Sequence, residues 1–530
     1  MAAPSYATDL TDITLSESTT GWAALGGGAS GLSLEPDFTI QGSNCIAKQI
    51  KAETKGHHYN YGSGIAMGAD DHVFVWNYVS TPGTPDLLAN GGIRVTMGTG
   101  STARKEFYVA GSDTYFRGGW VCYPVRYSQT ADATSGSPGA NPQYFGIVMK
   151  GTVTVKAPNM GVDAIRYGSD VQITAGDGTT PATFVALAQY ADNSTRSWGL
   201  IQEISGGVSV QGKVRIGTSS TACEFDESNV LVVFPNNNPS AVNQKTLAGF
   251  KEVIIDNAGT DVTWTGITFL SLDGTDKGDF TVTNASAVLW DGCTFQSVGD
   301  TVLHSSVTAS SCTWLGAGQI TSNSAEFDGC VIKDSAATEA VAASTLNDFT
   351  DCSFESGGTG HAIDLGTVST STTMSWNSFD SGYAATDGST GNETLLVNVA
   401  AGQTLTINVG SGYTTPTVYN TGSGTVNVVS GQVTTTIKVV DVTTGSAIQN
   451  ARVYLTASAG GSLTEGTVIF NDLTDVNGEV SDTRSLGSNQ PVTGRVRKGS
   501  SGALYKTSPI TGTVDSGAGL SLTVQMIPDD

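Results

Sequence analysis

The segment Asp291-Gly292-Cys293-Thr294-Phe295 recurs in altered form as Asp328-Gly329-Cys330-Val331-Ile332. In both copies a small residue is followed by one spacer and then by a large apolar residue. Four further segments have a small or apolar residue, one spacer and a large apolar residue, with Asn377 as the polar exception: Thr265–Phe269, Ser311–Trp314, Thr350–Phe354 and Ser375–Phe379. The equivalent positions 267, 293, 312, 330, 352 and 377 lie 18 to 26 residues apart. The middle of the chain is therefore a repeat of short supersecondary units.

A repeat of this length indicates a solenoid, in which each unit packs only on its neighbours. Apolar and polar residues alternate with a period of two inside each copy, so the repeating element is a strand. Glycine, serine and threonine fill the intervals and disfavour helical repeats. We expect a right-handed parallel β-helix over residues 201–432, with successive coils about 4.8 Å apart.

Stacked coils place equivalent side chains directly above one another, which predicts two internal columns. The first contains Ile267, Cys293, Cys312, Cys330, Cys352 and Asn377. The second contains Phe269, Phe295, Trp314, Ile332, Phe354 and Phe379. The cysteines form no CxxC pair, so we interpret them as buried thiols rather than as metal ligands or disulfide partners.

The two ends of the chain differ from this repeat. Residues 1–200 hold strand-like segments at 72–78 and 105–109 with glycine-rich turns, which predicts a β-sandwich of jelly-roll or lectin-like type. Residues 433–530 contain the strand Thr435–Asp441, then Ala451–Leu455 and a turn segment Thr474–Val480. This order resembles the carboxypeptidase-regulatory-like, or prealbumin-like, immunoglobulin-type sandwich. The chain is thus expected to be all-β and built of three modules.

Composition limits the function classes. The formal charge is −23, which repels polyanions, so nucleic-acid binding is not expected. The sequence has no apolar run of membrane-spanning length, and its first residues do not have the basic start and apolar core of a signal peptide. We therefore expect no membrane insertion and no secretory route.

Three short stretches are similar to structural proteins of tailed bacteriophages: residues 8–22, the segment Gly111–Tyr115 and the segment Asn450–Val453. The resemblance implies a component of the virion surface, as a spike, fibre or capsid decoration. It also implies synthesis in the host cytoplasm, release by lysis, and contact with other virion proteins. A homo-oligomer, with a trimer favoured, and adhesion to host surface glycans are further expectations from this resemblance.

Phage β-helix proteins include polysaccharide-cleaving tailspikes, which need two suitably spaced carboxylates. Asp328 and Asp351 are the candidates, because both lie just before a cysteine of the repeat, as Asp291 does. Turn chemistry explains these aspartates with fewer assumptions. We therefore expect a non-enzymatic protein, with a tailspike depolymerase as the alternative and a cellular surface adhesin as a third reading.

Carbohydrate recognition would use exposed aromatic rings with polar neighbours, and the alternative for each ring is a place in the sandwich core. The candidates are Trp76, Tyr78, Tyr115, Trp120 and Tyr123. His57-His58 is interpreted as an exposed pair without a catalytic partner. The clusters Asp70-Asp71 and Asp273–Asp276 are interpreted as acidic turns rather than calcium sites. No metal and no cofactor are expected.

Overall fold

The computed structural model describes residues 6–529 with gaps in between. The intervals outside the description are 9–10, 26–31, 38, 40–41, 50–54, 69–70, 80–87, 110–118, 152–158, 169–170, 174–180, 189–200, 211, 236–250, 273–276, 357–359, 369–371, 375–377, 387–390, 412 and 500–502. Strands dominate the described residues, and the only α-helix among them is α1 (Phe184–Leu187). The prediction of an all-β chain is confirmed. No helix in this part of the chain is long and apolar enough to cross a membrane.

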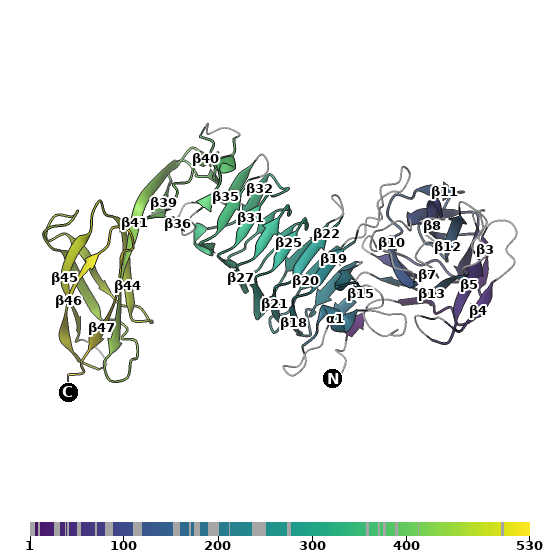
Figure 1. Ribbon diagram of the computed structural model, residues 1–530, viewed down its shortest axis with the longest axis horizontal. Helices are drawn as coiled ribbons and strands as arrows, with labels where there is room; N and C mark the ends of the chain where they lie inside the picture. The colour runs from purple at the N-terminus through teal and green to yellow at the C-terminus, as the bar shows by residue number, and fades with distance from the viewer. Residues whose placement is uncertain are drawn as a thin grey trace. The chain divides into compact units, whose positions relative to one another are not determined.

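The chain divides into two compact units, Met1–Val341 and Ala342–Asp530. Figure 1 draws the chain in colours that run from purple at the start of the first unit to yellow at the end of the second. The division falls inside the segment expected to form one solenoid. The three modules with boundaries at 200 and 432 stay a prediction.

The first part of unit 1 consists of two antiparallel sheets. One sheet has the order β10 (Gly119–Arg126), β7 (His72–Val79), β13 (Asn159–Gly168), β5 (Cys45–Gln49) and β4 (Ser33–Glu35), and β2 (Thr11–Thr14) also pairs with β13. The other has the order β11 (Ala133–Ser135), β9 (Arg104–Val109), β8 (Leu88–Gly98), β12 (Tyr144–Gly151), β6 (Lys55–Asn60) and β3 (Trp22–Leu25). Val73 and Val75 of β7 share one core with Val95 and Phe107 of the second sheet. Alternation along the strands thus directs one face of each sheet inwards.

The rest of unit 1 is a stack of coils built from three parallel ladders. The first ladder contains β14 (Val171–Ile173), β17 (Lys213–Ile216), β20 (Lys251–Ile255), β23 (Gly278–Val282), β26 (Thr301–Val302) and β29 (Ile320–Thr321), with β1 (Tyr6–Thr8) antiparallel to β14 and β32 (Glu339–Ala342) at the end of the unit. The second contains β16 (Gly207–Val210), β19 (Leu231–Phe234), β22 (Thr268–Ser271), β25 (Thr294–Gln296), β28 (Thr313–Leu315) and β31 (Val331–Lys333), preceded by the antiparallel β15 (Ile201–Ile204). The third contains β18 (Glu224–Ser228), β21 (Asp261–Thr265), β24 (Ala287–Asp291), β27 (Val307–Ser310) and β30 (Glu326–Asp328).

We call these strands the coil stack. The chain passes through the three ladders in turn, and each strand pairs with its counterpart one coil later. The first ladder already includes β14, so parallel pairing begins before the expected boundary at residue 201. A right-handed parallel β-helix remains our interpretation of these ladders.

One corner of every coil requires a left-handed backbone. The residues between the third and second ladders have φ between +50° and +63°, at Asn229, Gly266, Gly292, Ser311 and Gly329. Glycine adopts this conformation without a steric penalty, and asparagine tolerates it better than most residues. The amide of Gly292 donates to the carbonyl of Ser310 at 2.9 Å, so the corner continues the hydrogen-bond ladder between coils. The short Gly-Cys and Ser-Cys pairs of the sequence are therefore corner signals.

The interior of the coil stack is filled by columns of like side chains. Phe269, Phe295, Trp314 and Ile332 occupy aligned positions in the second ladder. The Phe269 and Phe295 rings stack at 5.2 Å between centroids, and the Phe295 and Trp314 rings stack at 4.8 Å. Ile267, Cys293, Cys312 and Cys330 directly precede this ladder and are fully buried.

A second aromatic column was not expected from the sequence. Trp264 of β21 and Trp290 of β24 are aligned neighbours in the third ladder, with rings 5.4 Å apart and 3° from parallel. Trp290 also contacts Phe295 at 5.0 Å, so the two columns meet in one core. The alternation of β24 explains this, since Val288 and Trp290 point inwards while Leu289 and Asp291 are exposed.

Unit 2 begins with short elements and parallel pairs. These are η3 (Leu346–Asp348), β33 (Phe349–Thr350), β34 (Ser353–Glu355) with β37 (Ser378–Phe379), β35 (His361–Thr367) with β38 (Leu395–Asn398) and β40 (Val418–Asn420), η4 (Ser381–Tyr383), and β36 (Thr372–Met374) with β39 (Thr404–Gly410). Phe354 aligns with Phe379, and Cys352 is buried. Asn377, the last member of the expected cysteine column, lies outside the described residues.

The long strand β41 (Thr425–Asp441) connects two parts of unit 2. Its first half pairs in parallel with β39, and its second half pairs with β44 (Glu479–Ser485) and β47 (Leu520–Met526). A second sheet has the order β43 (Val468–Leu473), β42 (Arg452–Ala457), β45 (Gln490–Lys498) and β46 (Tyr505–Val514). The two sheets enclose one core around Ile437, Val453 and Val496. We call this two-sheet part, residues 433–529, the C-terminal sandwich.

Candidate functional site

The aromatic candidates for glycan binding lie on the paired strands β7 and β10. Trp120 is the cross-strand partner of Tyr78, and their rings contact at 5.4 Å between centroids. Trp76 meets the Trp120 ring edge-on at 6.5 Å. Tyr78 and Trp120 are half-buried. The pairing of the two strands thus brings three of the five candidates together.

The other candidates are less accessible. Trp76 is 2% exposed, and Tyr123 is 7% exposed and belongs to the core between the two sheets. Such burial leaves neither ring a free face for a sugar in this structure. Tyr115 lies outside the described residues.

The candidate carboxylate Asp328 is exposed on the outer side of the coil stack. It ends β30 and aligns with Ser310, which in turn aligns with Asp291 one coil earlier. A serine therefore separates the two aspartates, whose backbones are about 9.6 Å apart at a strand spacing of about 4.8 Å. Both side chains point away from the core, since their strands alternate between buried and exposed residues.

Asp351 has a different place in its unit. Its φ of +50° gives it the left-handed backbone that Gly329 has before Cys330. The Tyr413 hydroxyl donates to the Asp351 carboxylate at 3.4 Å. The expectation that Asp291, Asp328 and Asp351 occupy comparable positions is therefore wrong. Asp351 is a corner residue, whereas Asp291 and Asp328 are the last residues of their strands.

The histidine pair was also placed incorrectly from the sequence. His57 and His58 are 2% and 4% exposed on β6, rather than forming an exposed pair. The His58 ring meets Tyr144 edge-on at 5.1 Å. Burial, together with the nearby Arg104, lowers the pKa of His58, so the neutral ring is favoured.

His361 has close partners in unit 2. Its Nδ1 lies 2.9 Å from the Glu393 carbonyl and 3.8 Å from the Glu393 carboxylate. The ring also stacks on Tyr419 at 5.7 Å. Glu393 is fully buried, so these contacts link β35 to the segment before β38 inside the fold.

The cysteines are free and buried. The Cys293 and Cys312 thiols each donate to a carbonyl of the preceding coil, at Trp264 and Trp290, over 3.4 Å. Hydrogen bonding to Cys293 and Cys330, with burial, raises the pKa of Cys312. A raised pKa keeps the Cys312 thiol protonated, so Cys312 is a packing group rather than a nucleophile. No cluster of metal-ligating side chains occurs within the described ranges, and Asp70 and residues 273–276 fall outside them.

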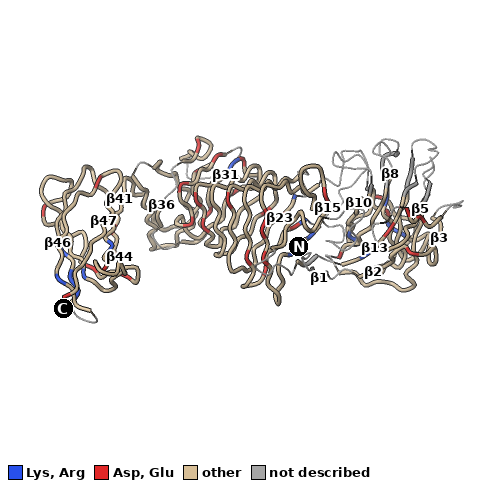
Figure 2. The backbone as a smooth tube through the Cα atoms, turned by 60° about the horizontal axis from the view of Figure 1, so that its bottom comes forward, with Lys and Arg blue, Asp and Glu red and all other residues tan. Residues whose placement is uncertain are grey.

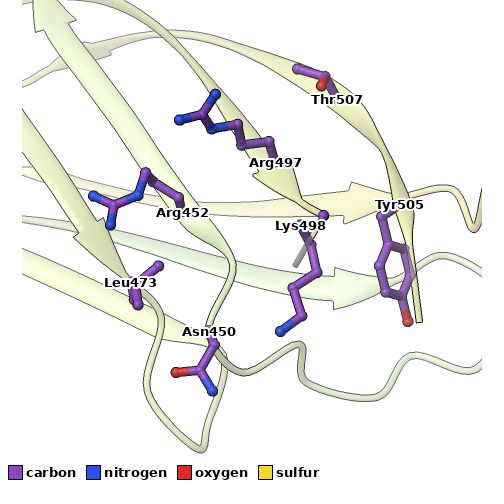
Figure 3. A pocket seen from close by; sticks show the side chains of 8 residues that line it. Asn450, Arg452, Leu473, Arg497, Lys498, Tyr505 and Thr507 are labelled. Atoms are coloured by element: carbon purple, nitrogen blue, oxygen red, sulfur yellow. The ribbon is translucent and has the colours of Figure 1, made fainter. Parts of the chain in front are cut away.

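A concave site of about 630 Å³ lies on the C-terminal sandwich. Figure 3 shows it, and its lining residues are Asn450, Arg452, Leu473, Arg497, Lys498, Gly499, Tyr505 and Thr507. We call this site the cationic pocket, because three of the described residues that line it are basic and none of those described is acidic. The strands β42, β43, β45 and β46 of one sheet supply most of the lining.

Strand pairing explains why two arginines meet here. Arg452 of β42 is the direct cross-strand partner of Arg497 of β45, so both side chains project from the same face of the sheet. Their side chains extend in a similar direction in Figure 3. Arg452 donates to the Asn471 carbonyl at 2.9 Å, which fixes its guanidinium. Arg497 is exposed, and within the described part of the chain neither it nor Lys498 forms an ion pair.

Tyr505 connects the pocket to the first sheet of the sandwich. Its hydroxyl donates to the Asp441 carboxylate at 3.0 Å. Partial burial and this hydrogen bond raise the pKa of Tyr505. Asp441 also accepts from the amides of Thr443 and Thr444, which lowers the pKa of its carboxyl. The phenol ring is thus held in one orientation at the pocket wall.

This pocket was not predicted from the sequence. One signal was available: Arg495-Val496-Arg497-Lys498 is a basic cluster in a chain with only 25 basic residues in 530. Alternation within a strand places Arg495 and Arg497 on the same face. The contribution of Arg452, 45 residues earlier, depends on strand pairing and could not be read locally. Figure 2 shows blue basic segments near the C-terminal end of the chain.

No protein-family model and no curated protein matches the chain. Among solved structures, the chain is 12% identical to a family 11 carbohydrate-binding module from Clostridium thermocellum, solved with a β-1,3-1,4-mixed-linked tetrasaccharide. The match covers 30% of this chain and 94% of that chain at a TM-score of 0.22. The Agl-KA catalytic domain is 10% identical, over 81% and 99% of the two chains, at a TM-score of 0.18. The catalytic unit of a GH87 α-1,3-glucanase from Streptomyces thermodiastaticus is 12% identical, over 79% and 95%, at 0.18.

These findings correct one expectation from the sequence. The chain was expected to be non-enzymatic, but two of the matched structures are catalytic domains. The exclusion of catalysis is therefore withdrawn. With TM-scores of 0.18 to 0.22, these similarities assign neither a substrate nor a reaction to this chain.

Proposed function

We propose that this chain is a structural and adhesive protein on the surface of a tailed bacteriophage particle, where it contacts glycans of the host. The observation that carries the proposal is the coil stack with its continuous internal columns. Phe269, Phe295 and Trp314 stack at 4.8 to 5.2 Å between ring centroids from coil to coil. Such close packing resists bending and suits a support for binding modules.

The surface chemistry is consistent with a protein present in many copies. A net charge of −23 favours solubility at high local concentration. The sandwiches offer binding surfaces, since one holds the half-buried pair Tyr78 and Trp120 and the other holds the cationic pocket. In this proposal the protein is made in the host cytoplasm, assembles as a trimer with other virion proteins and is released by lysis.

The test is to locate the chain on particles. Particles purified by density gradient are probed with an antibody to the C-terminal sandwich, examined by electron microscopy, and analysed by mass spectrometry. We expect the antibody to decorate one defined part of each particle, with stoichiometric peptides from the chain. Absence of the chain from purified particles, with its presence in the soluble lysate, would overturn the proposal.

Polysaccharide cleavage is a second candidate, favoured by the geometry of Asp291 and Asp328. Both are exposed on one outer face, about two strand spacings apart, close to the range of about 6.5–9.5 Å between carboxyl groups in inverting glycosidases. Asp291→Asn and Asp328→Asn should each abolish release of reducing ends from host polysaccharide. Asp351→Asn is the matched control and should retain activity. No release by the parent chain, or equal loss in all three variants, would reject this candidate.

A further inference from the structure

The cationic pocket has a charge that opposes that of the whole chain. Arg452, Arg497 and Lys498 line it, and none of the described lining residues is acidic, whereas the chain carries a net charge of −23. The Asp441 carboxylate contacts the lining residue Tyr505, and it already accepts from the Tyr505 hydroxyl and from two backbone amides. The positive charge of the pocket is therefore not neutralised by the lining itself.

The arrangement of the two arginines is costly without a ligand. Like charges directly opposite each other on paired strands destabilise a sheet, and Arg452 and Arg497 are such a pair. The positive charge of the nearby Arg495 has a partner in the protein, because its guanidinium lies 5.9 Å from the centroid of the Tyr454 ring. An anion between Arg452 and Arg497 would convert their repulsion into two favourable contacts. Guanidinium groups bind carboxylates through paired, charge-assisted hydrogen bonds.

The rest of the lining has the chemistry of a sugar site. Tyr505 offers an aromatic ring, and Leu473, which is 48% exposed, adds an apolar wall. Asn450 and Thr507 supply an amide and a hydroxyl that can bond to sugar hydroxyls. A volume of about 630 Å³ is within the usual range for organic ligands and exceeds the need of a lone inorganic anion.

We propose that the cationic pocket binds an acidic sugar of the uronic acid type within a polysaccharide. The sugar carboxylate pairs with Arg452 and Arg497, while Lys498 balances the remaining charge. The sugar ring lies between Tyr505 and Leu473. The inference deepens the proposed function by naming the class of glycan and its site.

The experiment measures binding to the full-length chain by isothermal titration calorimetry. The probes are a galacturonic acid trisaccharide, the neutral galactose trisaccharide of the same length, and inorganic sulfate. Arg452→Gln and Arg497→Gln each remove one charge from the pocket. Lys506→Gln is the matched control, because it removes the same charge from β46 between two lining residues but does not line the pocket. Circular dichroism melting checks that every variant is folded.

We expect the acidic trisaccharide to bind and the neutral one to bind at least about tenfold more weakly, since a hydrogen bond to a charged group is worth more than a neutral one. Each arginine variant should lose about tenfold in affinity, Lys506→Gln should change little, and added salt should weaken binding. If an arginine variant unfolds, Tyr505→Phe is measured in its place, and sulfate is tested as a competitor of the acidic sugar. Sulfate should then displace the acidic sugar, since both need the same cations.

Three results would overturn the assignment. One is equal binding of the acidic and neutral sugars. Another is an equal loss of affinity in Lys506→Gln, which would mean that any positive charge near the pocket, and not the lining arginines themselves, attracts the sugar. The third is salt-sensitive association of the chain with itself that disappears in the arginine variants without any sugar binding, which would assign the pocket to a second copy. If the chain is on particles but binds no acidic sugar, only this inference fails. If it binds the sugar but is absent from particles, only the virion role fails.

Discussion

At the scale of single residues, the coil stack depends on one backbone conformation repeated in every coil. Asn229, Gly266, Gly292, Ser311 and Gly329 all turn the chain with positive φ before an inward-pointing residue. No side-chain hydrogen bond is needed to continue the ladder at this corner, because the backbone of the corner residue carries the hydrogen bonds between coils. The sequence showed Gly-Cys and Ser-Cys pairs, but it did not show that Asp351 takes this role too.

The corner leads to a prediction for Gly329. A Cβ there would meet its nearest neighbour, Ser311 Oγ, at 3.9 Å, so space is sufficient and only φ of +61° opposes a side chain. Gly329→Asn should be tolerated, whereas Gly329→Val should destabilise unit 1 by about 1–2 kcal/mol or more because a β-branched residue is strained in the left-handed region. Chemical unfolding monitored by tryptophan fluorescence measures both. Equal stability of the two variants would contradict the corner argument.

Asp441 gives a prediction for the pH dependence of the C-terminal sandwich. Hydrogen bonds from the amides of Thr444 and Thr443 lower the pKa of its folded carboxyl below the ordinary 3.8. The ionised form is thus favoured in the folded state, and its stabilisation is present above pH 3.8 and lost as the pH falls through the lowered folded pKa. Asp441→Asn should lower the melting temperature at pH 7, and the difference from the parent should shrink in acid.

Differential scanning calorimetry from pH 7 down to pH 2 checks this. Asp472→Asn, at an exposed position on β43, serves as the control with the same change of charge. A difference between Asp441→Asn and the parent that stays constant with pH would show that the carboxylate contributes only by its shape.

At the scale of elements, the strand alternation defines what is inside each coil. In β24 the buried Val288 and Trp290 alternate with the exposed Leu289 and Asp291. The same alternation in β21 brings Trp264 under Trp290, with their planes 3° apart. The sequence predicted the column of Phe269, Phe295 and Trp314 from its short motif. It did not predict the tryptophan column, because these residues lie one strand earlier and outside the motif.

The tryptophan column leads to a prediction at this scale. Trp290→Ala should destabilise unit 1 by about 3–5 kcal/mol, because removing a fully buried ring leaves a cavity in the stack. Leu289→Ala is the matched control on the same strand; Leu289 is 47% exposed, and its loss should cost less than about 0.5 kcal/mol. Urea unfolding measures both. Similar losses in the two variants would mean that the column does not stabilise the stack.

At the scale of the whole molecule, the composition and the proposed role lead to an expected mass. Ends of parallel ladders are open strand edges, and association with further chains is one way to cover them. The proposed trimer should have a mass of about three times 54.4 kDa in light scattering. The mass should not change on addition of 1 M salt if apolar contacts dominate the association. A single-chain mass at micromolar concentration would reject the trimer.

The sequence and the tertiary structure determined different features of this protein. The sequence alone determined the all-β class and the repeat, because strand periodicity and the 18 to 26-residue spacing are local properties of the chain. It also located the aromatic and cysteine positions, since stacked coils repeat the same side chain at the same place. Tertiary structure alone decided which aspartates share an outer face and which aromatic rings are covered. It alone formed the cationic pocket, because Arg452 and Arg497 are distant in sequence and meet only through the pairing of β42 with β45.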